Sequence, residues 1–218
     1  MIKCQNVSFS YDMKNKVLKK VNLHLETGKI GVIIGLNGCG KTTLLKCIGK
    51  SINNYKGTIN TSNKTCYIND LPDDCENLTG KEYLNKLYTF LESKKRNLID
   101  TMIKFSGIND DINKRIKLVS LYTRQILIIL TAICFDSDTL LLDEPFLGLD
   151  RNSQLLIVEI IKLLKAEGKT ILIGTNLMYF GFNLADTIFI LHQGKVKQIN
   201  NGFINHKYYD DHIFKLLF

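Results

Sequence analysis

The sequence predicts an α/β protein built around a parallel sheet. Two short runs that are almost wholly apolar, 30–34 and 140–142, and the β-branched run 170–175 are typical of strands buried on both faces. Helical periodicity separates these runs. Between the last two of them, one helical face gathers Leu156, Ile160, Leu163 and Leu164. Strands that alternate with helices in this way indicate a sheet covered by helices.

Length and composition favour one cytosolic domain spanning 1–218. The chain is 45% hydrophobic and 23% charged, which is ordinary for a globular domain. The apolar run 126–135 is about half of the roughly 20 residues that cross a bilayer, so it predicts a buried helix. Residues 1–11 lack the apolar core of a signal peptide, and the six cysteines contain no CxxC pair. We therefore expect a cytoplasmic protein with reduced thiols.

The net charge of +8 is compatible with binding to nucleic acid or to an anionic membrane. The lysines are spread along the sequence, and only the segment 94–96 groups three basic residues. No module combining basic and aromatic residues accompanies them. We therefore expect no specific nucleic-acid partner.

The strongest chemical signal is the segment GLNGCGKTT, which follows the first apolar run directly. It matches the phosphate-binding pattern G-x-x-x-x-G-K-[ST] in the required order of strand, loop and helix. Its glycines let backbone N–H groups surround a phosphate, Lys41 reaches the β- and γ-phosphates, and the Thr42 hydroxyl is a magnesium ligand. The predicted nucleotide-binding residues here are Gly35, Asn37, Gly38, Cys39, Gly40, Lys41, Thr42 and Thr43.

A second signal is LLLDEP, an apolar strand that ends in two acids. A P-loop enzyme needs one carboxylate to hold magnesium and another to orient or deprotonate the attacking water. We assign these roles to Asp143 and Glu144. An apolar strand ending in acids is common, so the pattern is weak evidence by itself. It becomes specific because a P-loop precedes it and the segment GLD follows it.

Two regions differ from the strand–helix alternation. From Leu78 to Ser120 the spacing is helical with many charges, which predicts an all-helical insertion. From Ile188 onward, two short strand-like runs are punctuated by Gly194 and Gly202, and the chain ends with an amphipathic segment, 213–218.

The chain resembles the nucleotide-binding domain of ABC transporters over nearly its full length. The resemblance rests on GLNGCGKTT, TLLLDEPFLGLD, LTGKEYL and the stretch VSFSY, and it is strongest to exporters of the bacitracin and lantibiotic-resistance type. It implies a P-loop NTPase fold of the ABC type, with a RecA-like core, an N-terminal antiparallel β subdomain, and a helical subdomain at about 78–135. It also implies ATP and Mg²⁺ as ligands.

The resemblance assigns further roles residue by residue. Tyr11 matches the aromatic that stacks on adenine. The alternative is that it only packs on the edge of a small sheet. Ser120, in VSLYT, occupies the signature position that grips the γ-phosphate bound to the opposite subunit. Asp150 ends the loop that crosses between subunits.

Three positions depart from the family pattern. Tyr122 replaces a glycine of the signature, where we expect its side chain to obstruct the phosphate. Asp70 replaces the glutamine that meets magnesium, so we keep it as a candidate metal ligand beside Thr42 and Asp143. Asn176 replaces the switch histidine, so the stabilisation of the transition state should fall.

We therefore expect an ATPase of low activity that powers or gates a separate membrane permease, from the cytoplasmic face of the membrane. Its partners would be that permease and a second ATPase subunit, identical or different. Two alternatives stay open: a regulatory module that binds ATP with little turnover, and a soluble ABC-type ATPase outside transport.

Overall fold

The computed structural model describes residues 1–12, 15–88, 91 and 93–200. Its central sheet has the strand order β5-β6-β7-β3-β8-β9. Neighbouring strands are parallel except β8 and β9, so the predicted parallel sheet is confirmed for all but its last strand. The strands are β3 (Ile30–Ile34), β5 (Thr65–Tyr67), β6 (Thr139–Asp143), β7 (Thr170–Thr175), β8 (Thr187–His192) and β9 (Lys195–Asn200).

The reversal between β8 and β9 has a local cause. Only Gln193 and Gly194 connect the two strands, and both have positive φ, 47° and 80°. Two such residues form the tight turn that joins antiparallel strands. The two strand-like runs predicted from Ile188 onward are thus confirmed as β8 and β9. Gly202 and the amphipathic segment 213–218 lie outside the described residues.

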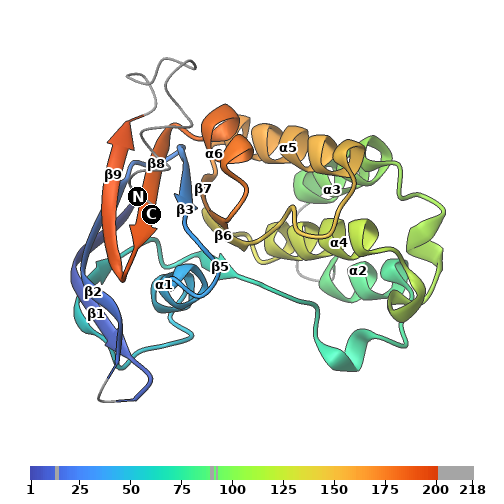
Figure 1. The fold of residues 1–218 in the computed structure, drawn as a ribbon. Helices are drawn as coiled ribbons and strands as arrows, with labels where there is room; N and C mark the ends of the chain where they lie inside the picture. The colour runs from blue at the N-terminus through green and yellow to red at the C-terminus, as the bar shows by residue number, and fades with distance from the viewer. Residues whose placement is uncertain (13–14, 89–90, 92, 201–218) are drawn as a thin grey trace.

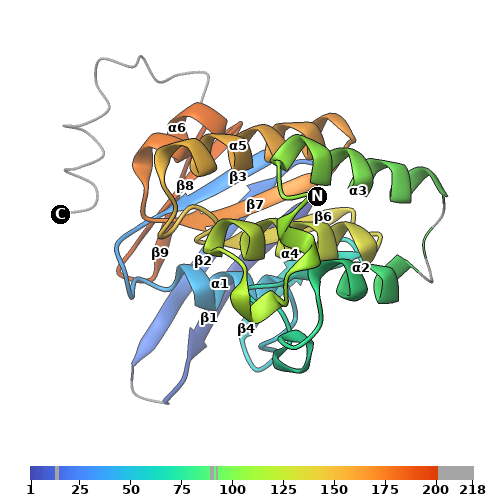
Figure 2. The same ribbon diagram turned by 90° about the vertical axis from the view of Figure 1, so that its right-hand side faces the viewer.

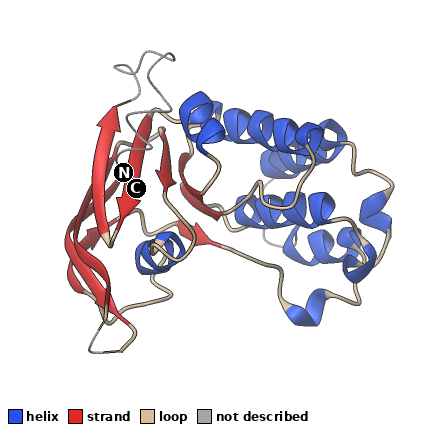
Figure 3. Cartoon of the chain, in the orientation of Figure 1, coloured by secondary structure: helices blue, strands red, loops and turns tan. Residues whose placement is uncertain are grey.

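A second, antiparallel sheet has the order β2-β1-β4. It consists of β1 (Ile2–Ser10), β2 (Lys16–Leu25) and β4 (Lys56–Asn60). Residues of β1 alternate between buried and exposed positions, as expected of a sheet with one solvated face. Figure 1 shows this sheet beside the central sheet, with all the labelled helices except α1 gathered on the other side of the molecule, and Figure 3 shows the same separation by element type.

The central sheet is covered on both faces, in agreement with its apolar strands. One face packs against α4 (Leu121–Cys134), α5 (Arg151–Ala166) and α6 (Met178–Leu184). The other face packs against α1 (Lys41–Ile48) and the antiparallel sheet, as the side view in Figure 2 shows. On α5, Ile160 and Leu164 are buried, but Leu163 is 42% exposed. Leu163 shares their helical face but lies at the boundary of the apolar stripe.

Between β5 and β6 the regular elements of the described chain are helices and 3₁₀ turns, joined by loops, with one isolated β-bridge, Thr79 to Arg115. The apolar run predicted as a buried helix forms the buried part of α4, although Phe135, just beyond the helix, is exposed. None of the described helices combines the length and apolar character needed to span a membrane. The helices of this segment are α2 (Gly80–Tyr88), α3 (Ser93–Ser106) and α4 (Leu121–Cys134), with 3₁₀ turns η1 (Asp73–Cys75), η2 (Asp111–Asn113) and η3 (Ile116–Leu118).

Candidate nucleotide-binding site

The carboxyl ends of β3, β6 and β7 meet at one edge of the central sheet. Ile34 pairs with Thr175, and Asp143 pairs with Gly174, so the segments that follow these strands emerge side by side. This is the edge at which open parallel sheets bind ligands. The P-loop, the acidic pair and Asn176 all lie there.

The P-loop conformation depends on its glycines. Gly38 and Gly40 have φ of 79° and 111°, values that side-chain-bearing residues rarely adopt. A Cβ atom on Gly35 would lie only 2.5 Å from the carbonyl oxygen of Leu191 on β8. Helix α1 begins at Lys41, directly after the loop, as the sequence predicts. Its N-terminal N–H groups therefore face the loop, where they favour an anion.

Lys41 is 6% exposed, and its ammonium has three acceptors within reach. It donates to the carbonyl oxygens of Gly35 and Leu36, at 2.9 and 3.3 Å, and lies 3.1 Å from Oε1 of Glu144. Phosphate oxygens are acceptors of the same kind. The lysine is thus held at the mouth of the loop, where it can exchange protein partners for a bound phosphate.

Glu144 is fixed from several sides. Its backbone has φ of 46°, and its N–H donates to the Gly174 carbonyl at 2.8 Å. Its carboxylate contacts Lys41 through Oε1 and accepts the Asn176 N–H at 3.2 Å through Oε2. A carboxylate held beside the P-loop lysine is well placed to polarise a water molecule near a terminal phosphate.

Asp143 has one oxygen available for a metal. Its Oδ2 accepts from the Tyr67 hydroxyl at 3.3 Å, while Oδ1 is buried and has no hydrogen-bond partner among the described residues. Burial, followed by the charge of Asp143, raises the pKa of Tyr67, which therefore remains a donor. A buried carboxylate oxygen with no partner fits Mg²⁺ or its bound water. In the described part of the chain, no group of three or more His, Cys, Asp or Glu side chains forms a metal cage.

Asn176 lies at the end of β7 and bridges to the P-loop. Its Nδ2 donates to Oδ1 of Asn37 at 3.1 Å, and its own Oδ1 is buried with no partner among the described residues. The side chain thus reaches the loop that would hold phosphate. It supplies a neutral amide there, in place of an imidazole.

Tyr11 stands beside the start of α1. Its hydroxyl lies 3.2 Å from the Thr43 hydroxyl, its ring meets Phe9 edge to face at 4.8 Å, and 66% of its surface is exposed. An exposed ring next to the P-loop helix is compatible with adenine stacking. Burial raises the pKa of the Cys39 thiol above its usual value.

Asp70 and Ser120 are held by contacts with α4. Oδ1 of Asp70 accepts from Nε of Arg124 at 2.8 Å, and the same guanidinium lies 3.7 Å from Glu76. Ser120 is the N-cap of α4, because its hydroxyl accepts the Thr123 N–H at 3.1 Å. Ser120 and the next residue, Leu121, are exposed, whereas Thr123 is buried. The metal role of Asp70 and the phosphate role of Ser120 stay predictions.

Tyr122 turns toward the helical region. Its hydroxyl donates to the Ser106 carbonyl at the end of α3, at 2.9 Å, and its ring packs against the main hydrophobic core. The side chain therefore has a structural role that the sequence does not reveal. The preceding residue, Leu121, is exposed and lies against Gly148, where an added Cβ atom would come within 2.9 Å of its Cδ2.

The family model described as "ABC transporter" matches residues 18–147 of this chain, more than half of its length. The chain belongs to the ABC transporter family. It is accordingly an ATP-binding subunit of the ABC transporter type.

Curated relatives cover most of the chain. The ABC transporter ATP-binding protein NatA of Bacillus subtilis is 31% identical over 215 residues, spanning 90% of this chain and 87% of NatA. The lantibiotic transport ATP-binding protein SrtF of Streptococcus pyogenes is 29% identical over 205 residues, spanning 90% and 89%. The bacitracin transport ATP-binding protein BcrA of Enterococcus faecalis is 30% identical over 214 residues, spanning 92% and 69%.

A solved ABC cassette has the same fold. The dimeric MJ0796 cassette, in a post-hydrolysis state bound to ADP and Pi, superposes with a TM-score of 0.76 at 24% identity and covers 92% of this chain and 99% of MJ0796. This likeness confirms the predicted fold class of an α/β ABC cassette with an antiparallel β subdomain.

The sequence-based assignment of the ABC site missed Gly174. A Cβ atom there would lie 3.0 Å from Leu45, 3.4 Å from the unpartnered Asp143 oxygen and 3.5 Å from Lys41. A glycine thus lets β7 approach both the P-loop helix and the acidic strand. The available signal was a glycine within the β-branched run TILIGT.

Proposed function

We propose that this chain binds MgATP and hydrolyses it slowly to power or gate a separate membrane permease of the exporter type. The observation that carries the proposal is the contact of Glu144 with both Lys41 and the Asn176 backbone, at 3.1 and 3.2 Å. The candidate base and the phosphate-binding lysine thus belong to one connected site.

Different residues of the chain bind the phosphates, the metal, the attacking water and the adenine. The P-loop N–H groups and Lys41 hold the β- and γ-phosphates, while Thr42 and Asp143 are the side chains that would hold Mg²⁺. When bound, the metal neutralises charge that develops between the β- and γ-phosphates. Glu144 orients the attacking water and accepts its proton, and Tyr11 supports the adenine.

Slow turnover follows from Asn176. The amide supplies one neutral hydrogen bond where the family pattern has a histidine that can carry charge. Loss of one donor to a developing charge costs on the order of 10²–10³ in rate. The Asn176–Asn37 bond of 3.1 Å supports the placement of this amide against the phosphate loop.

Pairing with a second ATPase subunit is part of the proposal. Ser120, just before α4, is exposed, and three leucines at the start of the helix and in the adjoining loops, Leu118, Leu121 and Leu147, are each more than half exposed. Exposed apolar residues grouped beside a candidate phosphate contact favour a surface that another subunit covers. The partner can be a second copy or a different ATPase.

The permease would bind the helical segment between Leu78 and Ser120. Phe105 on α3 is 45% exposed and offers an apolar contact for a short helix of the membrane partner. The substitution Phe105→Ser should reduce association with permease-containing membranes without changing ATP affinity. Unchanged association would contradict this contact.

The decisive experiment measures steady-state phosphate release by the purified protein, by its Glu144→Gln variant, and by each in the presence of the permease. We expect slow release that Glu144→Gln reduces further and that the permease alters. A rate unaffected by Glu144→Gln would overturn the assignment of the base, and a rate that matches efficient family members without any partner would overturn slow turnover.

A further inference from the structure

The positive charge of the protein is concentrated in its first 60 residues. This segment contains ten lysines, two acidic residues and no arginine, which accounts for the whole formal charge of +8. Residues 61–200, by contrast, contain 17 basic and 17 acidic residues. Because the first 60 residues include all of β1, β2 and β4, the charge belongs mainly to the antiparallel sheet and its surroundings.

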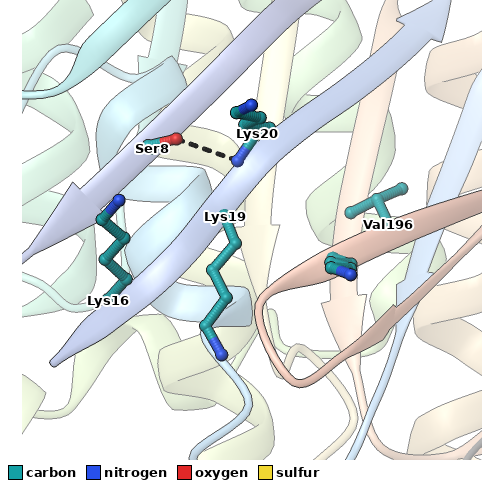
Figure 4. Close-up of a pocket in the computed structure, with 6 residues that line it drawn as sticks. Ser8, Lys16, Lys19, Lys20 and Val196 are labelled. Carbon is teal, nitrogen blue, oxygen red and sulfur yellow. Dashed lines mark hydrogen bonds between the residues drawn. The ribbon is translucent and has the colours of Figure 1, made fainter.

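The fold adds a lysine from the other end of the chain. Strand β2 lies next to the β8–β9 turn, where the Lys19 N–H donates to the Gly194 carbonyl at 2.7 Å. A shallow pocket of about 380 Å³ forms there, and Figure 4 shows its lining. The lining residues are Ser8, Lys16, Lys19, Lys20, Lys195 and Val196.

A second depression, of about 440 Å³, adjoins the first through Ser8 and Lys16 and adds Lys56. No acidic residue lines either hollow. We call the combined surface the basic face, defined by Lys16, Lys19, Lys20, Lys56 and Lys195.

The charge of the basic face is not neutralised by the protein. Within the described ranges none of its five lysines forms an ion pair, although lysines elsewhere do so readily. Lys64 pairs with Asp136 at 2.6 Å, and Lys165 pairs with Asp186 at 2.7 Å. Five uncompensated ammonium groups on one surface repel one another. Binding of an external anion would reduce this repulsion.

The arrangement suits an extended anion. In Figure 4, Lys16 and Lys19 extend in opposite directions along the surface and do not converge on a common point. A lysine ammonium is a point charge without the planar fork that reads bases or grips single phosphates in a fixed geometry. Such a surface fits a diffuse layer of negative charge.

We propose that the basic face binds the anionic surface of a lipid bilayer directly. The choice of a bilayer rests on the proposed function, since a subunit that works with a membrane permease stands beside lipid headgroups. Lysines near an anionic membrane each strengthen binding by about fivefold, so five of them give substantial attraction. Lipid and permease would then hold the subunit at two separate places.

The test uses the purified full chain and sedimentation with two kinds of vesicle, phosphatidylcholine alone and phosphatidylcholine mixed with phosphatidylglycerol. We expect binding to the anionic vesicles only, and weaker binding as salt screens the charges. The triple variant Lys16→Gln, Lys19→Gln, Lys195→Gln should bind on the order of 100-fold more weakly. Its MgATP affinity and melting temperature should match those of the wild type, which shows that it folds.

A matched control removes the same charge elsewhere. The variant Lys81→Gln, Lys104→Gln, Lys117→Gln changes three exposed lysines of the helical region. It should retain vesicle binding within a few-fold. Equal losses in both triple variants would show an effect of net charge alone and overturn the basic face.

Two further outcomes would also overturn it. One is equal binding to neutral and anionic vesicles. The other is a clear preference for a mixed-sequence oligonucleotide over anionic vesicles that the first triple variant abolishes, since this would assign the face to nucleic acid. If the protein hydrolyses ATP but does not bind anionic vesicles, the lipid-binding role of the basic face is overturned and the proposed function is unaffected. If it binds anionic vesicles but does not hydrolyse ATP, the basic face is supported and the proposed function is overturned.

Discussion

The ammonium of Lys41 and the carboxylate of Glu144 lie 3.1 Å apart, so the phosphate-binding cation and the candidate base neutralise each other directly. Both side chains are largely shielded from water, which strengthens their attraction. A bound triphosphate attracts the lysine and repels the carboxylate. Nucleotide binding must therefore reorganise this pair, and changes to either residue should have distinct effects.

Lys41→Ala should weaken MgATP binding by at least about tenfold, because charge-assisted hydrogen bonds contribute about 1.5–3 kcal/mol each. Isothermal titration calorimetry measures the change. Lys46→Ala, on the same helix, is the matched control and should bind normally. Equal affinities of the Lys41 variant and the wild type would show that the P-loop does not hold phosphate as described.

Glu144→Gln should separate binding from chemistry. The amide cannot accept a proton from water, so turnover should fall on the order of 10²–10³. The affinity for MgATP should stay the same or increase, because a negative charge beside the triphosphate is removed. Phosphate release and nucleotide titration measure the two effects, with Glu159→Gln on the surface of α5 as control. A parallel loss of affinity and rate would contradict a catalytic role.

The local parts of the site could be predicted from the sequence, but its long-range contacts could not. The apolar strands, the P-loop and the acids after β6 each follow from a short segment whose chemistry is visible in its own residues. The Asp70–Arg124 ion pair joins residues 54 apart, and the bond from Tyr122 reaches Ser106 on another helix. Such contacts depend on how α4 docks, which no local pattern specifies.

The position of the basic face also could not be predicted from the sequence. Read along the chain, the lysines look dispersed, because Lys195 is remote from those of β2. The neighbouring positions of β2 and the β8–β9 turn bring them onto one surface. The sequence therefore gives the amount of charge but not the face that carries it.

Asn176→His should raise turnover, because histidine supplies a donor that can carry charge to the γ-phosphate. Tyr122→Gly would remove the side chain that we expect to obstruct the phosphate at the signature position. The same change should also destabilise the protein, because Tyr122 packs against the core and its hydroxyl donates to the Ser106 carbonyl. Rates should therefore be normalised to the folded fraction. An unchanged rate in the correctly folded Asn176→His variant would show that the amide does not limit hydrolysis.

Tyr122→Phe isolates the hydroxyl. It removes the bond to the Ser106 carbonyl and keeps the ring, so stability should fall by about 0.5–1.5 kcal/mol. Urea unfolding measures this loss. Tyr179→Phe, an exposed tyrosine on α6, serves as the control with the same chemical change. Equal stability of Tyr122→Phe and the wild type would show that the bond contributes nothing measurable.

Asp150 should make stability depend on pH. It caps α5, and hydrogen bonds led by the Ser153 hydroxyl hold its pKa below the usual value. Because the folded-state pKa is lowered, its stabilisation is present above the unfolded-state pKa, near 4, and is lost as pH falls through the lower folded value. Asp150→Asn keeps a cap but should remove this part of the acid dependence in urea titrations. An identical dependence in both proteins would contradict the assignment.

The ion pair between Asp70 and Arg124 offers the sharpest test of the metal site. It joins the loop after β5 to α4 and is partly exposed, so a double-mutant cycle with Asp70→Asn and Arg124→Ala should give a coupling of about 0.2–1 kcal/mol.

If Asp70 also approaches the metal, the two variants should shift the Mg²⁺ dependence of turnover in opposite directions. Arg124→Ala frees the carboxylate and should lower the Mg²⁺ concentration for half-maximal rate, while Asp70→Asn should raise it. Arg115→Ala, an exposed residue of the same region, should leave it unchanged. Shifts in the same direction, or none, would leave the ion pair as a structural contact and remove Asp70 from the metal ligands.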